Sequence, residues 1–245
     1  MTDANGWEAV SWSKHDLLAA CNGDTLVPVE VSIDSGDYRD LYRPAQSSSR
    51  RQFEAGVPVP LSFLLEHIQQ LSGESEQSIG EASSGMSREA AGSEGARLYL
   101  AQRDVSEVLP ELAAALPASL PFREVRDRMH QRSVWLGPKG TQTPLHCDPY
   151  HNLLCQVWGT KLVRLYSPQY ASKLHPFPNP FLRNTSQVDV LDPEVNRFPG
   201  FEAVPYLQCW LRQGQMLYIP RKWWHFVQAA SSSLSISYWW TDEQS

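Results

Sequence analysis

One short stretch of the chain places two potential metal ligands two residues apart. His146 and Asp148 lie within the run Thr143-Pro-Leu-His-Cys-Asp-Pro-Tyr-His-Asn152. On a β-strand, residues i and i+2 point to the same face, so this imidazole and this carboxylate would converge on one point. A second histidine, His225, follows far downstream, just after the apolar run Met216-Leu-Tyr-Ile-Pro220.

Two histidines and one carboxylate on neighbouring strands form the ligand set of non-heme Fe(II) oxygenases. Such a triad fills three coordination positions and leaves the others open for a cosubstrate and oxygen. A lone His-x-Asp is common by chance and usually forms a surface or capping pair, so the rest of the chain must decide between the two interpretations.

Composition limits the classes of protein to which the chain can belong. Its 245 residues are enough for one sizeable domain, and a hydrophobic content of 42% excludes wholesale disorder. A net charge of -6 argues against broad, sequence-independent binding to nucleic acid. We therefore predict a single domain over residues 1–245 that binds no nucleic acid directly.

Cysteine usage and the first residues bear on the compartment. The four cysteines, at positions 21, 147, 155 and 209, show no C-x-x-C spacing, which fits a reducing compartment. The sequence shows no signal peptide and no apolar run of membrane-spanning length. We expect a nuclear or cytoplasmic protein, or one in both places, without membrane association.

The sequence pattern predicts many short strands and few helices. Strands are predicted at 25–31, 97–102, 132–137, 152–158, 161–166, 207–211, 216–219, 225–228 and 233–240, and helices at 14–21, 60–71 and 105–116. Gly159-Thr160 predicts a two-residue hairpin turn between two of these strands. Residues 32–60 read as irregular, 72–96 as a disordered serine-rich insertion, and 167–206 as a proline-rich excursion.

The strand pattern favours a sandwich or jelly roll. In the last strand, Leu234, Ile236, Tyr238 and Trp240 alternate with small serines, so one face packs on a second layer. A double-stranded β-helix, which holds a metal and a small ligand between its sheets, fits both this pattern and the triad. We predict this mainly β, cupin-like fold with a few flanking helices.

The motifs together resemble one family. The run from Thr143 to Asn152 is similar to the iron-binding strand of the JmjC-domain oxygenases, which are cupin-fold enzymes that use Fe(II) and 2-oxoglutarate. The runs Gly159-Thr-Lys-Leu-Val-Arg-Leu-Tyr-Ser-Pro168, Tyr218-Ile-Pro-Arg-Lys-Trp-Trp-His225 and Ser235-Ile-Ser-Tyr-Trp-Trp240 continue the match in the family's order.

A subgroup of that family, described both as histone lysine demethylases and as peptidyl-arginine hydroxylases, is the most similar. The runs Val27-Pro-Val-Glu-Val31, Tyr99-Leu-Ala-Gln102, Trp135-x-Gly-Pro138 and Asn184-Thr-Ser-Gln-Val-Asp189 carry this resemblance. It extends from about Trp7 to Trp240. The family usually has more strand and helix before Trp7, so the N-terminal part looks short.

The resemblance implies roles for individual residues. His146, Asp148 and His225 would bind iron, and O2 would take an open position. Lys161 would pair with the distal carboxylate of 2-oxoglutarate. The side chains of Tyr99, Thr143 and Asn152 would help to bind the same carboxylate. A buried dianion needs a fixed cation and hydrogen-bond donors, or its desolvation is uncompensated.

The same resemblance places Glu30, Gln102 and Trp135 in the substrate cleft. A carboxylate there could hold a guanidinium or an ammonium, and a tryptophan face could pack on the alkyl stem. Periodicity alone would make Glu30 solvent-facing. The expected substrate is a protein or peptide with a cationic side chain, with histones and ribosomal or chromatin-associated proteins as candidates.

Several functions stay open at this point. A guanidinium group can donate two parallel hydrogen bonds to one carboxylate. Glu30 therefore favours arginine C–H hydroxylation over demethylation of N-methyl-lysine. An inactive cupin binding module is a second alternative, and a metal-dependent cupin without 2-oxoglutarate is a third. Such cupins commonly use more histidines, whereas His151 lies at an odd offset from His146 and should face away from the metal. The side chain of Cys147 should also point away.

Overall fold

The computed structural model describes residues 12–33, 53–72, 96–117 and 129–242, in which β-strands dominate. The strands are β1 (Leu26–Ser32), β2 (Phe53–Pro60), β3 (Arg97–Asp104), β4 (Met129–Gly137), β5 (Gln142–Cys147), β6 (His151–Trp158), β7 (Thr160–Tyr166), β8 (Tyr206–Arg212), β9 (Met216–Ile219), β10 (Trp224–Ala229) and β11 (Ser233–Trp240). The helices are α1 (Lys14–Ala20), α2 (Leu61–Ser72), α3 (Val105–Val108), α4 (Pro110–Ala115) and the 3₁₀ helix η5 (Pro168–Lys173). No helix among these residues is long and apolar enough to cross a membrane.

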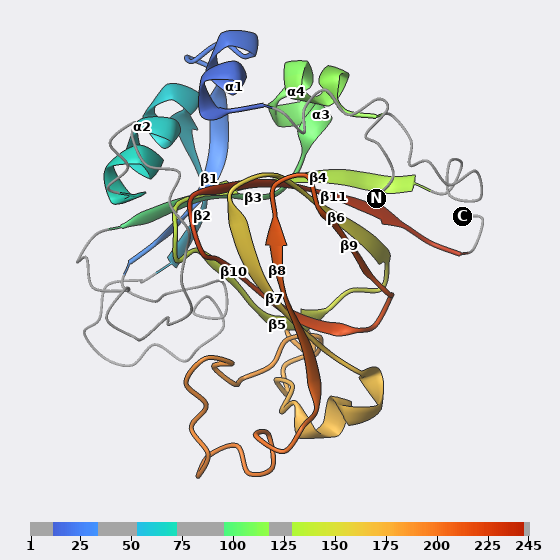
Figure 1. Ribbon diagram of the computed structural model, residues 1–245. Helices are drawn as coiled ribbons and strands as arrows, with labels where there is room; N and C mark the ends of the chain where they lie inside the picture. The colour runs from blue at the N-terminus through green and yellow to red at the C-terminus, as the bar shows by residue number, and fades with distance from the viewer. Residues whose placement is uncertain (1–11, 34–52, 73–95, 118–128, 243–245) are drawn as a thin grey trace.

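The strands form two antiparallel sheets. The larger has the order β2-β1-β3-β4-β11-β6-β9 and the smaller the order β5-β10-β7-β8 (Figure 1). Four strands of the larger sheet, β4-β11-β6-β9, face the four strands of the smaller one, while β3, β1 and β2 extend the larger sheet to one side. This arrangement is the double-stranded β-helix that the sequence predicts, so the expected fold class is confirmed.

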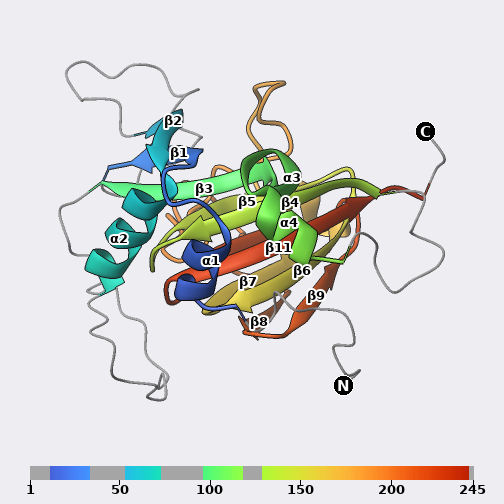
Figure 2. The same ribbon diagram turned by 90° about the horizontal axis from the view of Figure 1, so that it is seen from above.

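The helices α1 to α4 cover the outer face of the larger sheet (Figures 1 and 2). The amphipathic spacing of α2 buries Leu61, Leu64 and Ile68 in the same core as Ile236 and Tyr238 of β11. These five side chains are fully removed from solvent. The apolar alternation along β11 therefore packs on a second layer, as predicted, and the opposite face of β11 is turned to the space between the sheets.

The segment between β7 and β8 lies on the other side of the molecule, against the outer face of the smaller sheet (Figure 1). It forms a separate apolar core in which Val188 and Phe198 pack with Leu145 of β5, Tyr166 of β7 and Phe226 of β10. Both outer faces of the β-helix are thus covered, and the space between the sheets is left for the candidate site.

The predicted hairpin around Gly159 is wrong. β6 pairs with β11 and β9, whereas β7 pairs with β10 and β8, so the two strands belong to different sheets. Gly159 has a φ of +75°, and a Cβ built there would lie 2.0 Å from the Ser232 carbonyl oxygen. Glycine is needed because the chain crosses from one sheet to the other at this corner, in tight contact with the turn before β11.

Two other predictions needed correction. Residues 53–60, expected to be irregular, form β2, because β1 supplies an antiparallel partner from Leu26↔Pro60 to Ser32↔Phe53. The single helix expected at 105–116 is two short helices, since Pro110 lacks the N–H that a continuous helix needs and starts α4 instead. The insertion predicted at 72–96 lies, apart from its two end residues, outside the described residues.

Candidate functional site

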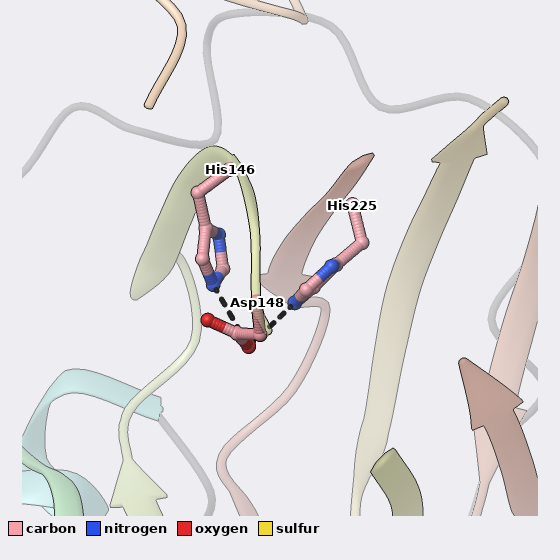
Figure 3. A group of neighbouring side chains, drawn as sticks. All are labelled: His146, Asp148 and His225. Carbon is pink, nitrogen blue, oxygen red and sulfur yellow. Dashed lines mark ion pairs between the residues drawn. The ribbon is translucent and has the colours of Figure 1, made fainter. Parts of the chain in front are cut away.

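The three predicted metal ligands meet at one end of the smaller sheet. β5 and β10 are neighbouring strands in a register that sets His225 opposite His146. Asp148 follows the end of β5, and its Oδ2 lies 3.6 Å from Nε2 of each histidine (Figure 3). One ligand atom from each residue lies within 4.8 Å of the other two. This spacing allows all three atoms to contact one metal ion.

Backbone contacts fix which nitrogen of each imidazole is available. Nδ1 of His146 lies 2.8 Å from the Pro144 carbonyl oxygen, and Nδ1 of His225 lies 3.1 Å from that of Trp223. A carbonyl only accepts, so each Nδ1 carries the proton and each Nε2 keeps a lone pair directed at Asp148. Oδ2 of Asp148 is buried without a hydrogen-bond partner. A divalent cation would satisfy all three atoms.

The protonation states suit a cation. Burial alone would raise the pKa of Asp148, but electrostatic interaction with the adjacent His146 holds that pKa down at about 2. Burial and the neighbouring His146 lower the pKa of His225 to about 4. Burial opposes protonation of His146 too, yet Asp148 raises its pKa overall. Near neutral pH the cluster therefore holds a carboxylate and a neutral His225, which is the donor set that Fe(II) accepts.

A cavity opens between the sheets beside the ligands. All four predicted cosubstrate residues and one predicted substrate residue line it. Its lining consists of Tyr99, Trp135, Thr143, His146, Asp148, Asn152, Leu154, Lys161, Ile219, His225, Val227, Ser237 and Trp239.

Lys161 is the buried cation of this cavity. Its side chain is 2% exposed, and its ammonium lies 5.9 Å from the centre of the Tyr99 ring. Burial lowers the pKa of Lys161 to about 7, and within the described part of the chain no carboxylate forms an ion pair with it. A bound carboxylate would restore the charge.

Neutral hydrogen-bonding groups stand near Lys161. The Tyr99 hydroxyl forms a hydrogen bond with Thr143. Burial, and to a smaller extent the charge of Glu30, raises the pKa of Tyr99, so its hydroxyl stays protonated. The Asn152 amide is buried, and its Oδ1 has no hydrogen-bond partner. A cation with neutral polar groups around it is an arrangement that can hold a small dianion.

The predicted substrate residues occupy different places. Trp135 lines the cavity, and its Nε1 donates to Ser237 Oγ at 3.0 Å. Glu30 is half-buried on β1 directly opposite Tyr99 of β3, so it stands beside the cavity without lining it. Gln102 is exposed, with a φ of +54°, where β3 bulges against β4. Gln102 lines a second, separate pocket, and its role in substrate binding stays a prediction.

The structure adds Trp239, which sequence reasoning missed. Trp239 lines the cavity, is 4% exposed, and its buried Nε1 has no hydrogen-bond partner. Its ring stacks on Tyr150 at 5.9 Å, which in turn stacks on His130 at 4.3 Å. The signal was present: Trp239 continues the small-residue face of β11 by two residues beyond Ser237, so the period of two places it inside the barrel.

Cys147 and His151 face away from the metal ligands, as predicted. Cys147 packs with Leu145 in the core outside the smaller sheet, and burial raises the pKa of its thiol to about 11. His151 Nε2 lies 2.8 Å from Oδ2 of Asp242, and its Nδ1 accepts from the Tyr218 hydroxyl at 2.7 Å. Neither side chain can join the triad in this arrangement.

The chain is similar in sequence to proteins named lysine-specific demethylases. Lysine-specific demethylase 8 of Xenopus tropicalis is 43% identical over 145 residues, which cover 58% of this chain and 33% of that protein. Lysine-specific demethylase JMJ30 of Arabidopsis thaliana is 46% identical over 111 residues, covering 45% of this chain and 26% of that protein. The chain thus spans about a third or less of the length of these two relatives.

A third relative extends the similarity over nearly the whole sequence. JmjC domain-containing protein F of Dictyostelium discoideum is 27% identical over 273 aligned positions, covering 97% of this chain and 55% of that protein. The family model described as a cupin-like domain matches residues 1–245. With this match and these relatives, the chain belongs to the cupin-like family of JmjC domains.

Proposed function

We propose that the chain is an Fe(II)- and 2-oxoglutarate-dependent oxygenase that oxidises a cationic side chain of a protein. The observation that carries this proposal is one cavity with two matched features. Its wall bears the convergent atoms of His146, Asp148 and His225, and its interior holds the buried ammonium of Lys161. The first feature suits Fe(II), and the second suits the distal carboxylate of 2-oxoglutarate.

The iron, when bound, would supply the redox chemistry that splits 2-oxoglutarate with O2 and oxidises a C–H bond. The chain's own residues set the geometry. Lys161 would hold the distal carboxylate, with the Tyr99, Thr143 and Asn152 side chains as neutral partners. The aromatic side chains of the cavity wall would limit the access of water, so these polar contacts would act in a medium of low dielectric constant.

For the substrate, we propose arginine hydroxylation first. Glu30 lies on β1 directly opposite Tyr99, whose ring centre is 6.2 Å from that of Trp135. A carboxylate can accept two parallel N–H bonds from a guanidinium, a geometry that a methylated ammonium cannot match. The Trp135 and Trp239 rings could then pack along the alkyl stem.

Demethylation of N-methyl-lysine is the second candidate, because two of the relatives are named lysine-specific demethylases. An aromatic wall also suits a methylated ammonium through cation–π attraction. Trp135, Trp239 and Tyr150 provide such a wall. The two activities share the metal centre and differ in the carbon atom that reaches it.

The first experiment is anaerobic binding of Fe(II) and 2-oxoglutarate, comparing the wild type with His146→Ala. The readout is the visible charge-transfer band of the iron–cosubstrate complex. We expect the band in the wild type and its loss in the variant. If iron binds without producing a band, the chain does not use 2-oxoglutarate, and a binding module becomes the better interpretation.

A second experiment separates the two substrates. Peptides with arginine or with N-methyl-lysine are incubated with wild type and Glu30→Ala, and mass spectrometry distinguishes the gain of an oxygen atom from the loss of a methyl group. We expect Glu30→Ala to abolish arginine oxidation but to spare uncoupled decay of 2-oxoglutarate. Undiminished oxidation of the arginine peptide by the variant would remove Glu30 from the proposal.

A further inference from the structure

The segment between β7 and β8 supplies an outer partner for β5, the strand that ends at the metal ligands. β5 is the first strand of the smaller sheet and pairs with β10 on one side. On its other side, Ser186 N donates to the Leu145 carbonyl at 2.7 Å, and Cys147 N donates to the Asn184 carbonyl at 2.9 Å. Residues 184–186 therefore hold β5 along the edge that β10 leaves open.

Asn184 makes the closest of these contacts to the ligands. Besides its backbone bond, its side-chain Nδ2 donates to the Cys147 carbonyl at 3.0 Å. Both polar backbone groups of Cys147 are thus bonded to this one residue. Cys147 is the residue between His146 and Asp148, so Asn184 holds the backbone that joins the two ligands.

The hydrogen bonds between Asn184 and Cys147 lie at the end of strand β5. β5 ends at Cys147, and Asp148 lies one residue beyond. The Asp148 carbonyl accepts from Lys222 N at 2.8 Å, on the approach to His225. The orientation of the Asp148 carboxylate depends on the peptide planes on either side of it. Asn184 fixes the one on the N-terminal side, and Lys222 fixes the one on the C-terminal side.

The segment that contains Asn184 is itself held in place by hydrogen bonds. Ser186 Oγ donates to the Leu174 carbonyl at 2.6 Å and accepts from Val188 N at 3.0 Å. Gln187 donates from its backbone N to the His175 carbonyl at 3.0 Å and from its Nε2 to that of Pro176 at 3.2 Å. The run 184–189 is recognisable in the sequence as a motif, but the sequence gives it no role in the chemistry. In the structure, hydrogen bonds to residues 174–176 hold this run in place.

We propose that Asn184 is a positioning residue, whose two hydrogen bonds to Cys147 set the angle between the His146 and Asp148 ligands. The inference rests on the proposed metal centre and adds a residue to it. Groups that orient metal ligands from outside typically change metal affinity by about 10- to 100-fold when removed. Because the Asn184 side chain is exposed, its loss should leave the fold intact.

The test measures Co(II) binding and the visible Co(II) spectrum of the full chain without cosubstrate. The variants are Asn184→Ala, which removes the side-chain donor, and Asn184→Asp, which sets a carboxylate oxygen against the Cys147 carbonyl. Asn179→Ala is the matched control, since the Asn179 side chain accepts from Phe181 N at 2.9 Å within the same segment and does not bond to β5. Thermal unfolding of the metal-free proteins is measured in parallel.

We expect Asn184→Ala to weaken Co(II) binding about tenfold and to alter the spectrum, and Asn184→Asp to weaken binding further. Asn179→Ala should keep wild-type affinity and spectrum, with an unfolding temperature close to that of Asn184→Ala. Wild-type Co(II) binding by both Asn184 variants would overturn the proposal, and so would an equal loss in Asn179→Ala. Failure of the wild type to bind Co(II) would overturn the metal centre itself, and this inference with it.

Discussion

Replacing Lys161 by methionine tests the cosubstrate site most directly. The substitution keeps much of the side-chain length and removes the charge. If Lys161 holds the distal carboxylate of 2-oxoglutarate, that carboxylate would then be buried without a cation. Breaking a buried ion pair by removing one partner costs about 3–5 kcal/mol, which corresponds to at least a hundredfold loss of affinity. Lys173→Met, at an exposed lysine of η5, is the control and should bind normally.

The same substitution should stabilise the protein in the absence of cosubstrate. Burial lowers the pKa of Lys161 from 10.5 to about 7, which corresponds to about 5 kcal/mol against the charged form. Between these two values the unfolded chain binds more protons than the folded one, so the free energy of unfolding of the wild type rises with pH across that window. Lys161→Met should therefore be the more stable protein below about pH 7, with an advantage that shrinks toward about pH 10.5.

Cosubstrate binding should carry the opposite proton signature. A carboxylate beside Lys161 favours the ammonium, so binding above about pH 7 should take up a proton, close to one full proton at about pH 8. Calorimetric titration of the Mn(II)-loaded protein in two buffers of different ionisation enthalpy measures this uptake. Binding without proton uptake at that pH, or wild-type affinity in Lys161→Met, would refute the assignment of Lys161.

Two glycines give further predictions. In Gly137→Ala the new Cβ would lie 2.6 Å from Cδ2 of Tyr99, so the ring must move; we expect weaker 2-oxoglutarate binding in titrations and a loss of about 1–3 kcal/mol in denaturant unfolding. Gly159→Ala should lose more than about 3 kcal/mol in the same assay, because its Cβ would meet the Ser232 carbonyl oxygen. Gly200→Ala is the matched control: its φ is also positive, at +82°, but no atom lies within 4 Å of the new Cβ, so only about 1–2 kcal/mol of backbone strain is expected.

Two of the three candidate metal ligands could be predicted from the sequence because their geometry is local. The spacing of His146 and Asp148 would place both on one face of a strand, and their side chains converge although β5 ends at Cys147, one residue before Asp148. The position of His225 required the pairing of β5 with β10, which the sequence pattern does not contain and the family resemblance supplied. The period of two along β11 separated the helix-packed face from the cavity face, and it could have identified Trp239 as well.

The errors arise where distant segments meet. Gly159 between two strands resembles a hairpin turn in sequence, but the decisive contact is with Ser232, more than seventy positions along the chain. β2 forms because β1 offers it an edge, not because residues 53–60 have strong strand propensity. The contact of Asn184 with Cys147 likewise comes from a proline-rich segment without periodicity. Local patterns carry no information about such pairings.

On the proposed function, the oxygen chemistry and the choice of substrate would lie on different parts of this fold. All three metal ligands and Lys161 belong to the smaller sheet or the loop that follows β5, whereas Glu30, Gln102 and Trp135 belong to the larger sheet and its extension. On the proposed assignment, hydroxylation of an N-methyl carbon of lysine would give a hemiaminal, which releases formaldehyde and leaves a demethylated lysine. Oxidation of any other carbon leaves a stable alcohol. The depth to which the larger sheet admits a cationic side chain would therefore decide between the two activities, with no change at the metal.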